Sequence, residues 1–413
     1  MVQIRNRQEL YSHFDEYTLL RKEELNQRNI KRGVGLLKTY AIETSATTRE
    51  EEIPAIFNRI GWSIEAIDTR LYQVRVDASE VTGYIDILSP RYFCFHTTAK
   101  SELSDTTVKR AVRSSVELDH VWLSSPILHL IWRELIGNSS RFATLRFENE
   151  PLFELLYKDP TIDEASDDDF SIAETRDDYL DDEIPERQVA RLEIKERINK
   201  LRAIMNSKLS TSLEEIMNNL TRIRAPSPNE QGRYEYFQYG KFTNRGNEFR
   251  GYAEHIRFLV EEVYGKATEI IEKTTAYALE QHVTKGDSES FQIRGAVSSF
   301  RFKEKLSNGV FERFIQLTFE RGRGPFRLWG NPIRLSGPKY HVYGIDLHLW
   351  QPIYLDMSPE RFLVVLPEGT CGNTIHRLTA NIQRYLDPLV TVTIGDREYT
   401  TIIEEALRST LKQ

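Results

Sequence analysis

The sequence contains little cysteine and lacks a long apolar run. Its 413 residues include two cysteines, Cys94 and Cys371, which excludes a disulfide framework and a Cys-x-x-Cys metal cluster. The charged N-terminus lacks the apolar stretch of a signal peptide. No window approaches about 18 uncharged apolar residues, so we expect no membrane span. A reducing cytoplasm is the expected compartment.

Motifs for cofactors, metals and nucleophiles are also missing. The sequence has no GxxxxGK[ST] and no GxGxxG in a strand–helix context. His341 and His348 are an odd number of residues apart in a strand-like region, which would put them on opposite faces. Cys371 in "EGTCGN" follows a strand-like run, with His376 five residues later, but it lacks the GxSxG elbow. We therefore expect no cofactor, no metal site and no cysteine nucleophile.

Negative charge is concentrated in one segment. The formal net charge of the chain is −7, yet residues 159–187 hold thirteen Asp or Glu and only two Arg. Residues 188–413 carry 32 Lys or Arg against 27 Asp or Glu. The acidic pI therefore does not argue against a nucleic-acid partner. The acidic segment has few large apolar residues and no calcium-loop spacing, which predicts a disordered linker.

Periodicity predicts an α+β protein with four parts. Residues 1–157 alternate helical and strand-like runs, typical of a mixed α/β domain. Residues 158–187 form the acidic linker. Residues 188–285 carry two apolar seams at helical spacing, from Ile194 to Ile223 and from Phe249 to Tyr277, which predict a long-helix hairpin.

The last part, residues 286–413, is dominated by period-two runs separated by glycine and proline. This pattern predicts a mostly antiparallel sheet with flanking helices. The strand-like runs include 311–322 and 326–337, and helices are expected at 373–387 and near the C-terminus.

The N-terminal part resembles one nuclease core in its order of elements. A helix, three strands, a helix and a strand follow one another over 47–124, as in restriction-endonuclease-like nucleases. Such a site needs two carboxylates for Mg²⁺ and a lysine beside the phosphate. Asp86 stands where the first carboxylate is expected, but the next strand offers only His96 and Lys100. An active nuclease, a degenerate core used for binding and an unrelated α/β domain all remain open.

A basic and aromatic segment in the C-terminal part is the second candidate site. Residues 321–344 contain no Asp or Glu. Arginine binds phosphate in a bidentate manner, and aromatic rings stack on bases. The predicted nucleic-acid-binding residues are Arg321, Arg323, Arg327, Trp329, Arg334, Lys339 and Tyr340. The alternatives are solvated hairpins or a surface for an acidic protein, including the chain's own acidic segment.

These patterns favour a non-enzymatic binding or scaffold component of a nucleic-acid-associated assembly. The expected partners are DNA or RNA, together with a protein partner or a second copy bound through the long helices. The alternatives are a metal-dependent nuclease at Asp86, His96 and Lys100, and an adaptor that binds only protein.

Overall fold

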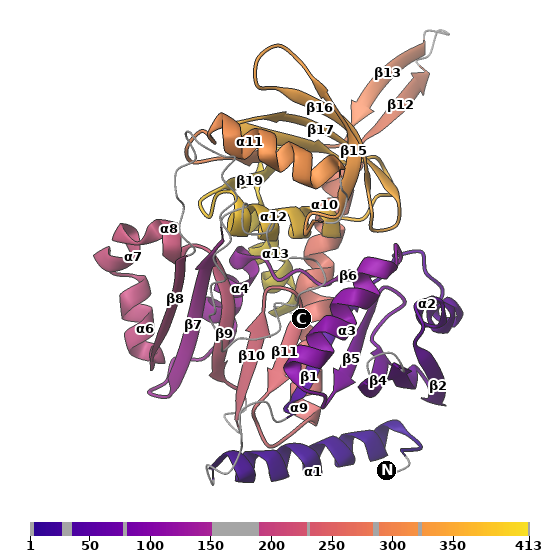
Figure 1. Ribbon diagram of the computed structural model, residues 1–413, viewed down its shortest axis with the longest axis vertical. Coiled ribbons are helices and arrows are strands. Elements are labelled where there is room, and N and C mark those ends of the chain that lie inside the picture. Colours follow the sequence, from indigo (N-terminus) through magenta and orange to yellow (C-terminus); the bar gives the residue numbers. More distant parts are fainter. Residues whose placement is uncertain are drawn as a thin grey trace, which may run out of the picture.

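The fold contains two large antiparallel sheets and several helices, which confirms the predicted α+β class (Figure 1). The computed structural model describes residues 4–26, 35–76, 81–150, 190–228, 232–283, 289–320 and 324–411. The acidic segment predicted as a linker lies outside the described residues.

The first sheet has eleven strands and takes them from both sides of the acidic segment. Its order is β2-β3-β4-β5-β1-β11-β10-β9-β7-β8, with β6 paired to β1. The strands are β1 Leu37–Glu43, β2 Ser63–Asp68, β3 Leu71–Val76, β4 Val81–Ile87, β5 Tyr92–Thr97, β6 Asp119–His120, β7 Phe142–Asn149, β8 Ala190–Arg197, β9 Leu220–Pro226, β10 Arg233–Phe237 and β11 Lys241–Asn244. The predicted domain boundaries remain a prediction, although this sheet contains strands from both sides of the predicted boundary at residue 157.

Strand β1 is the centre of this sheet, and all seven of its residues are buried. It pairs with β5 on one side and β11 on the other, in the register Tyr40↔Phe95 and Tyr40↔Lys241. Because both faces are buried, polar and apolar residues do not alternate along its sequence, LKTYAIE.

The sequence predicts helices over 5–30, 47–60, 104–117 and 126–137, and the N-terminal part has helices in these four regions. They are α1 Arg7–Asn26, η1 Glu50–Glu52, α2 Ile53–Arg59, α3 Ser101–Ser114, α4 Ser125–Leu130 and η3 Ile131–Leu135. Helix α1 lies along one end of the first sheet (Figure 1). Its Phe14 ring contacts Phe249, with 4.8 Å between the ring centroids.

The prediction of a first long helix in the hairpin is wrong. Residues 190–226 instead form strand β8, three short helices and strand β9; the helices are α6 Ile198–Met205, α7 Lys208–Ser212 and α8 Glu214–Met217. In β8, burial alternates residue by residue as Leu192 and Ile194 face the core. This edge strand pairs with β7. The apolar residues of β8 and α6 together have the spacing of a helix, but the pairing with β7 makes β8 a strand.

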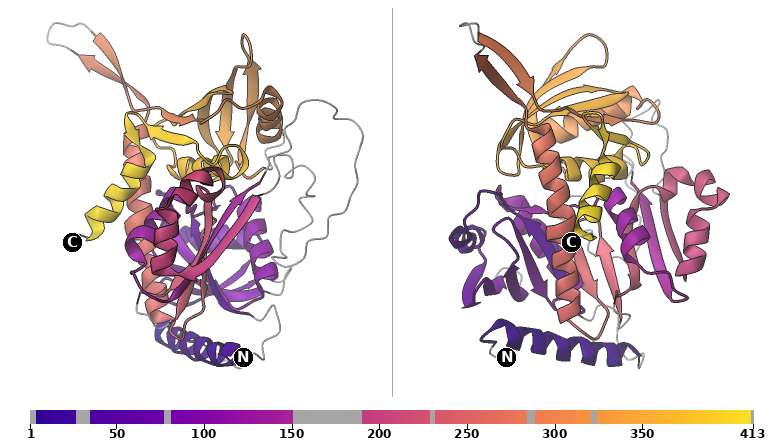
Figure 2. Two further views of the ribbon diagram at one scale, coloured as in Figure 1. Left: turned by 90° about the vertical axis from the view of Figure 1, so that its left-hand side faces the viewer. Right: turned by 180° about the vertical axis from the view of Figure 1, so that it is seen from behind.

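The second predicted seam forms one long helical segment made of α9 Arg250–Arg257, η4 Phe258–Gly265 and α10 Lys266–Thr275. It runs along one side of the first sheet and reaches the second sheet (Figure 2). Tyr252, Leu259, Val263 and Ala267 on its seam are buried. The seam is therefore covered by this chain's own residues.

The second sheet has seven strands in the order β15-β16-β17-β18-β14-β19-β20, and β12 pairs with β13 in a separate hairpin. The strands are β12 Ala278–Val283, β13 Glu289–Arg294, β14 Ser298–Arg301, β15 Leu328–Arg334, β16 Tyr340–Asp346, β17 Gln351–Ser358, β18 Arg361–Val365, β19 Thr391–Ile394 and β20 Arg397–Glu398. This confirms the predicted antiparallel sheet.

One predicted strand of this part is wrong. Residues 308–320 form helix α11 Asn308–Ile315 and its continuation η5 Gln316–Glu320. The Ser307 side chain caps the helix by accepting a bond from the Val310 amide at 3.3 Å. Phe311, Phe314 and Phe319 lie on one helical face and are buried. Their aromatic character suggests a strand, but the buried residues Phe311, Phe314, Ile315 and Thr318 recur at i, i+3, i+4 and i+7, the spacing of one helical face.

Helix α12, Asn373–Tyr385, lies between the two sheets (Figure 1), and α13, Tyr399–Leu411, packs beside α10. Twelve of the thirteen residues of α12 are buried, including His376 and Arg377. A helix buried on every side must satisfy its polar groups internally. In the part of the chain described, no helix combines the length and the apolar character that a membrane span requires.

Candidate functional site

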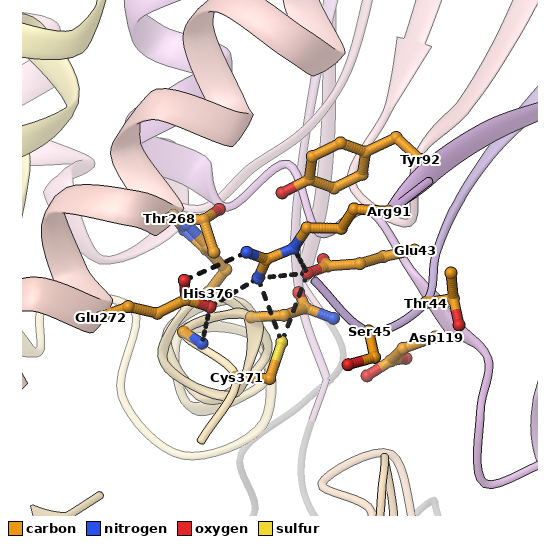
Figure 3. A network of polar contacts seen from close by, with 12 residues as sticks. Glu43, Thr44, Ser45, Arg91, Tyr92, Asp119, Thr268, Glu272, Cys371 and His376 are labelled. Atoms are coloured by element: carbon orange, nitrogen blue, oxygen red, sulfur yellow. Dashed lines mark hydrogen bonds and ion pairs between the residues drawn. The ribbon is translucent and has the colours of Figure 1, made fainter. Parts of the chain in front are cut away.

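Polar side chains from both halves of the chain meet in a buried network around Arg91 (Figure 3). Arg91 lies in the turn between β4 and β5. Its guanidinium contacts the carboxylates of Glu43, at the end of β1, and Glu272, on α10, at 2.7 and 2.6 Å. It also lies 3.3 Å from the Sγ atom of Cys371, which is 280 positions away in the sequence.

Burial changes the acidity of this network. The Cys371 thiol donates to Glu43 Oε1 at 3.3 Å, and the Tyr264 hydroxyl donates to Glu43 Oε2 at 3.4 Å. Burial raises the pKa of Glu43 to about 7, although Arg91 opposes this shift. Burial also raises the pKa of the Cys371 thiol. Without a bound cation, Cys371 is thus a protonated thiol and not a reactive nucleophile.

A second buried charge cluster surrounds Arg377 on α12. Its fully buried guanidinium binds Asp119 of β6 and, at 2.5 Å, Asp346 at the end of β16. Arg327 adds a contact with Asp119 at 3.4 Å. Burial would raise the pKa of Asp119, but Arg377 and Arg327 hold it below its usual value. The cluster joins the first sheet, the second sheet and α12.

Two fully buried histidines near these clusters differ in their partners. His376 uses both ring nitrogens, with Thr268 Oγ1 at 3.1 Å and the Tyr399 hydroxyl at 2.5 Å. His348 follows β16, and neither of its ring nitrogens has a hydrogen-bond partner among the described residues. Burial lowers the pKa of His376 to about 3 and that of His348 to about 4, so both are neutral.

The three nuclease candidates are not gathered into an open site. Asp86 on β4 is buried, and its carboxylate binds Arg7 of α1 at 2.6 Å and Arg257 of α9 at 3.7 Å. His96 on β5 is also buried, with its Nδ1 atom 2.8 Å from Thr39 Oγ1. Asp86 pairs with Cys94, which places Asp86 and His96 on one face of the sheet. Lys100 is exposed just before α3.

The predicted nucleic-acid-binding residues separate into three groups. Arg321 and Arg323 lie outside the described residues. Arg327 and Tyr340 point inward: Arg327 donates to the Leu118 carbonyl at 2.6 Å, and the Tyr340 hydroxyl donates to Glu312 at 2.5 Å. They support the fold and are not placed to contact a polynucleotide.

The other three predicted residues, Trp329, Arg334 and Lys339, are exposed. Trp329 belongs to an outer aromatic face, which we define as Trp329 of β15, Tyr343 of β16 and Tyr354 of β17. Their side chains are 51%, 66% and 40% exposed. Tyr343 pairs directly with Tyr354, and their ring centroids are 5.8 Å apart.

Strand alternation explains why this face is open. The neighbouring residues Leu328, Val342 and Leu355 point to the other face of the sheet and are buried. Helix α11 covers that other face (Figure 1), where the Phe314 and Phe362 rings stack with their centroids 4.9 Å apart. The outer aromatic face has no such helix over it among the described elements.

Sequence reasoning missed Tyr354 and both buried charge clusters. The charged members come from seven separate segments, and no local spacing links them. One weak signal was present: Glu43 follows the apolar residues Tyr40, Ala41 and Ile42 at the end of the strand "LKTYAIE", and a buried strand rarely contains a carboxylate.

The chain belongs to the family described as MJECL33-like protein, whose sequence pattern matches residues 1–401. One relative is "Uncharacterized protein MJECL33" of Methanocaldococcus jannaschii, to which the chain is 23% identical over 400 residues. That alignment covers 93% of this chain and 93% of the relative. No solved structure matches the chain.

Proposed function

We propose that this protein binds single-stranded nucleic acid on the outer aromatic face of its second sheet, as a binding component without catalytic activity of its own. The observation that carries the proposal is the presence of three exposed aromatic rings on one open face of an antiparallel sheet. Base stacking on such rings is worth about 1–3 kcal/mol per base and tolerates any sequence.

The exposed charges around this face include several positive ones, which suit a phosphate backbone. The described stretch from Gly324 to Gly344 contains no Asp or Glu. Lys339 is exposed at the end of the β15–β16 pair, and Arg361 and Arg301 are exposed on β18 and β14. Arg334 points to the other face of the sheet, where it lies 3.7 Å from Glu312 of α11. Asp356 is an acidic residue on this face and lies 3.6 Å from His341. A protein partner is the competing occupant, which the test below distinguishes.

Replacing Trp329 and Tyr343 together by Ala is expected to weaken binding to single-stranded DNA or RNA by at least tenfold, because two stacking surfaces are lost. Binding of labelled oligonucleotides by fluorescence anisotropy, across a salt series, measures this. Phe142→Ala is the matched control, since Phe142 is 41% exposed on the first sheet. Folded wild-type protein that binds no oligonucleotide at low salt would overturn the proposal and favour the protein-binding adaptor.

A further inference from the structure

Three side chains with different donor atoms converge where the first sheet meets the second. Glu43 ends β1, His348 lies in the turn between β16 and β17, and Cys371 lies just before α12. One carboxylate oxygen, one imidazole nitrogen and one sulfur atom lie within 4.8 Å of one another. Glu43 and His348 are 0% exposed and Cys371 is 5% exposed.

The unpartnered ring of His348 is the observation that points to a ligand. A buried polar atom nearly always has a hydrogen-bond partner, and an exception requires a physical reason. His376 is equally buried, but both its nitrogens are bonded. Within the described part of the chain both nitrogens of His348 lack a partner. A neutral imidazole with a free lone pair is a ready metal ligand.

The surrounding charges balance a divalent cation. Arg91 contributes one positive charge, while Glu43 and Glu272 contribute two negative ones. A Cys371 thiolate would add a third negative charge. With a divalent ion, these groups carry no net charge. The same groups without an ion, with Cys371 as a thiol, carry one excess negative charge when both carboxylates are ionised.

We propose that Glu43, His348 and Cys371 bind one divalent transition-metal ion, for which Zn²⁺ is the best match. A thiolate, an imidazole and a carboxylate are the three ligand types that zinc takes in proteins. Arg91 holds Glu43 Oε1 at 2.7 Å and so orients the carboxylate. The ion would join β1, the β16–β17 turn and the start of α12. This site is separate from the outer aromatic face and does not depend on the function proposed there.

The test is a Co²⁺ titration of full-length protein freed of metal by a chelator. We expect about one Co²⁺ per chain, with a thiolate-to-cobalt charge-transfer band in the near ultraviolet. Cys371→Ser is expected to lose this band. The control Cys94→Ser is expected to keep it, because Cys94 is buried in β5 outside the ligand group. His348→Gln is expected to weaken Co²⁺ binding by at least tenfold.

The wild-type titration decides the matter even where a variant fails to fold. Folded wild-type protein, checked by circular dichroism, that takes up neither Co²⁺ nor Zn²⁺ overturns the proposal. A band that survives in folded Cys371→Ser, or that disappears equally in folded Cys94→Ser, also overturns it. A higher melting temperature with Zn²⁺ but not with Mg²⁺ supports it, because Mg²⁺ prefers oxygen ligands.

Discussion

Replacing Arg377 by Met is expected to lower the free energy of unfolding by about 3–5 kcal/mol, the usual cost of breaking a buried ion pair from one side. Arg377 is fully buried between the carboxylates of Asp119 and Asp346. Met has a similar length but no charge, so both carboxylates would lose this partner in a medium that solvates them poorly. Urea unfolding followed by circular dichroism measures the loss.

The matched control is Arg397→Met, which breaks the pair between Arg397 and Glu405 at the surface. Those side chains are 35% and 56% exposed, so the expected loss is below about 1 kcal/mol. Adding Asp119→Asn and Asp346→Asn to Arg377→Met should restore part of the stability, since the two carboxylates would no longer be charged. Equal losses in Arg377→Met and Arg397→Met would contradict the proposed role of the buried charges.

Local sequence signals predicted the N-terminal elements well because those elements follow one period each. The strands predicted over 71–78, 81–89 and 92–99 begin at the same residues as β3, β4 and β5. The prediction for the region after the acidic segment was wrong for a physical reason. Leu192 and Ile194 have the spacing of a strand, Ile198 and Leu201 have the spacing of a helix, and together they resemble one helical seam. Pairing of β8 with β7 decides between the two.

The sites were less predictable than the fold. The outer aromatic face was partly visible in the sequence, because Trp329 belongs to the predicted basic and aromatic segment. The segment's composition could not show that Arg327 points inward, where it bonds to the Leu118 carbonyl. The Glu43, His348 and Cys371 group joins positions up to 328 residues apart. Only the packing of the two sheets on α12 brings these residues together.

The free energy of unfolding is expected to fall by roughly 3–4 kcal/mol between about pH 7.5 and about pH 5.5 in protein treated with a chelator. Burial lowers the pKa of several histidines: His96, His120 and His255 to about 4, and His376 to about 3. In the unfolded chain each titrates near about 6.5. Their stabilisation is thus complete above that pH and is lost as the pH falls towards 4, since only the unfolded chain takes up protons. Each proton contributes about 1.4 kcal/mol per pH unit.

The raised pKa of Glu43 changes the free energy of unfolding in the opposite direction, but this one carboxyl offsets only part of the effect of the four histidines. Its pKa is raised to about 7, so the stability it contributes is present at low pH and is lost as the pH rises towards 7. Urea midpoints measured across this range test the net result. His96→Gln is expected to reduce the pH slope by about one proton, and His341→Gln, at a side chain that is 46% exposed, is the matched control. A flat profile, or equal slopes in both variants, would show that the buried histidines do not control acid unfolding.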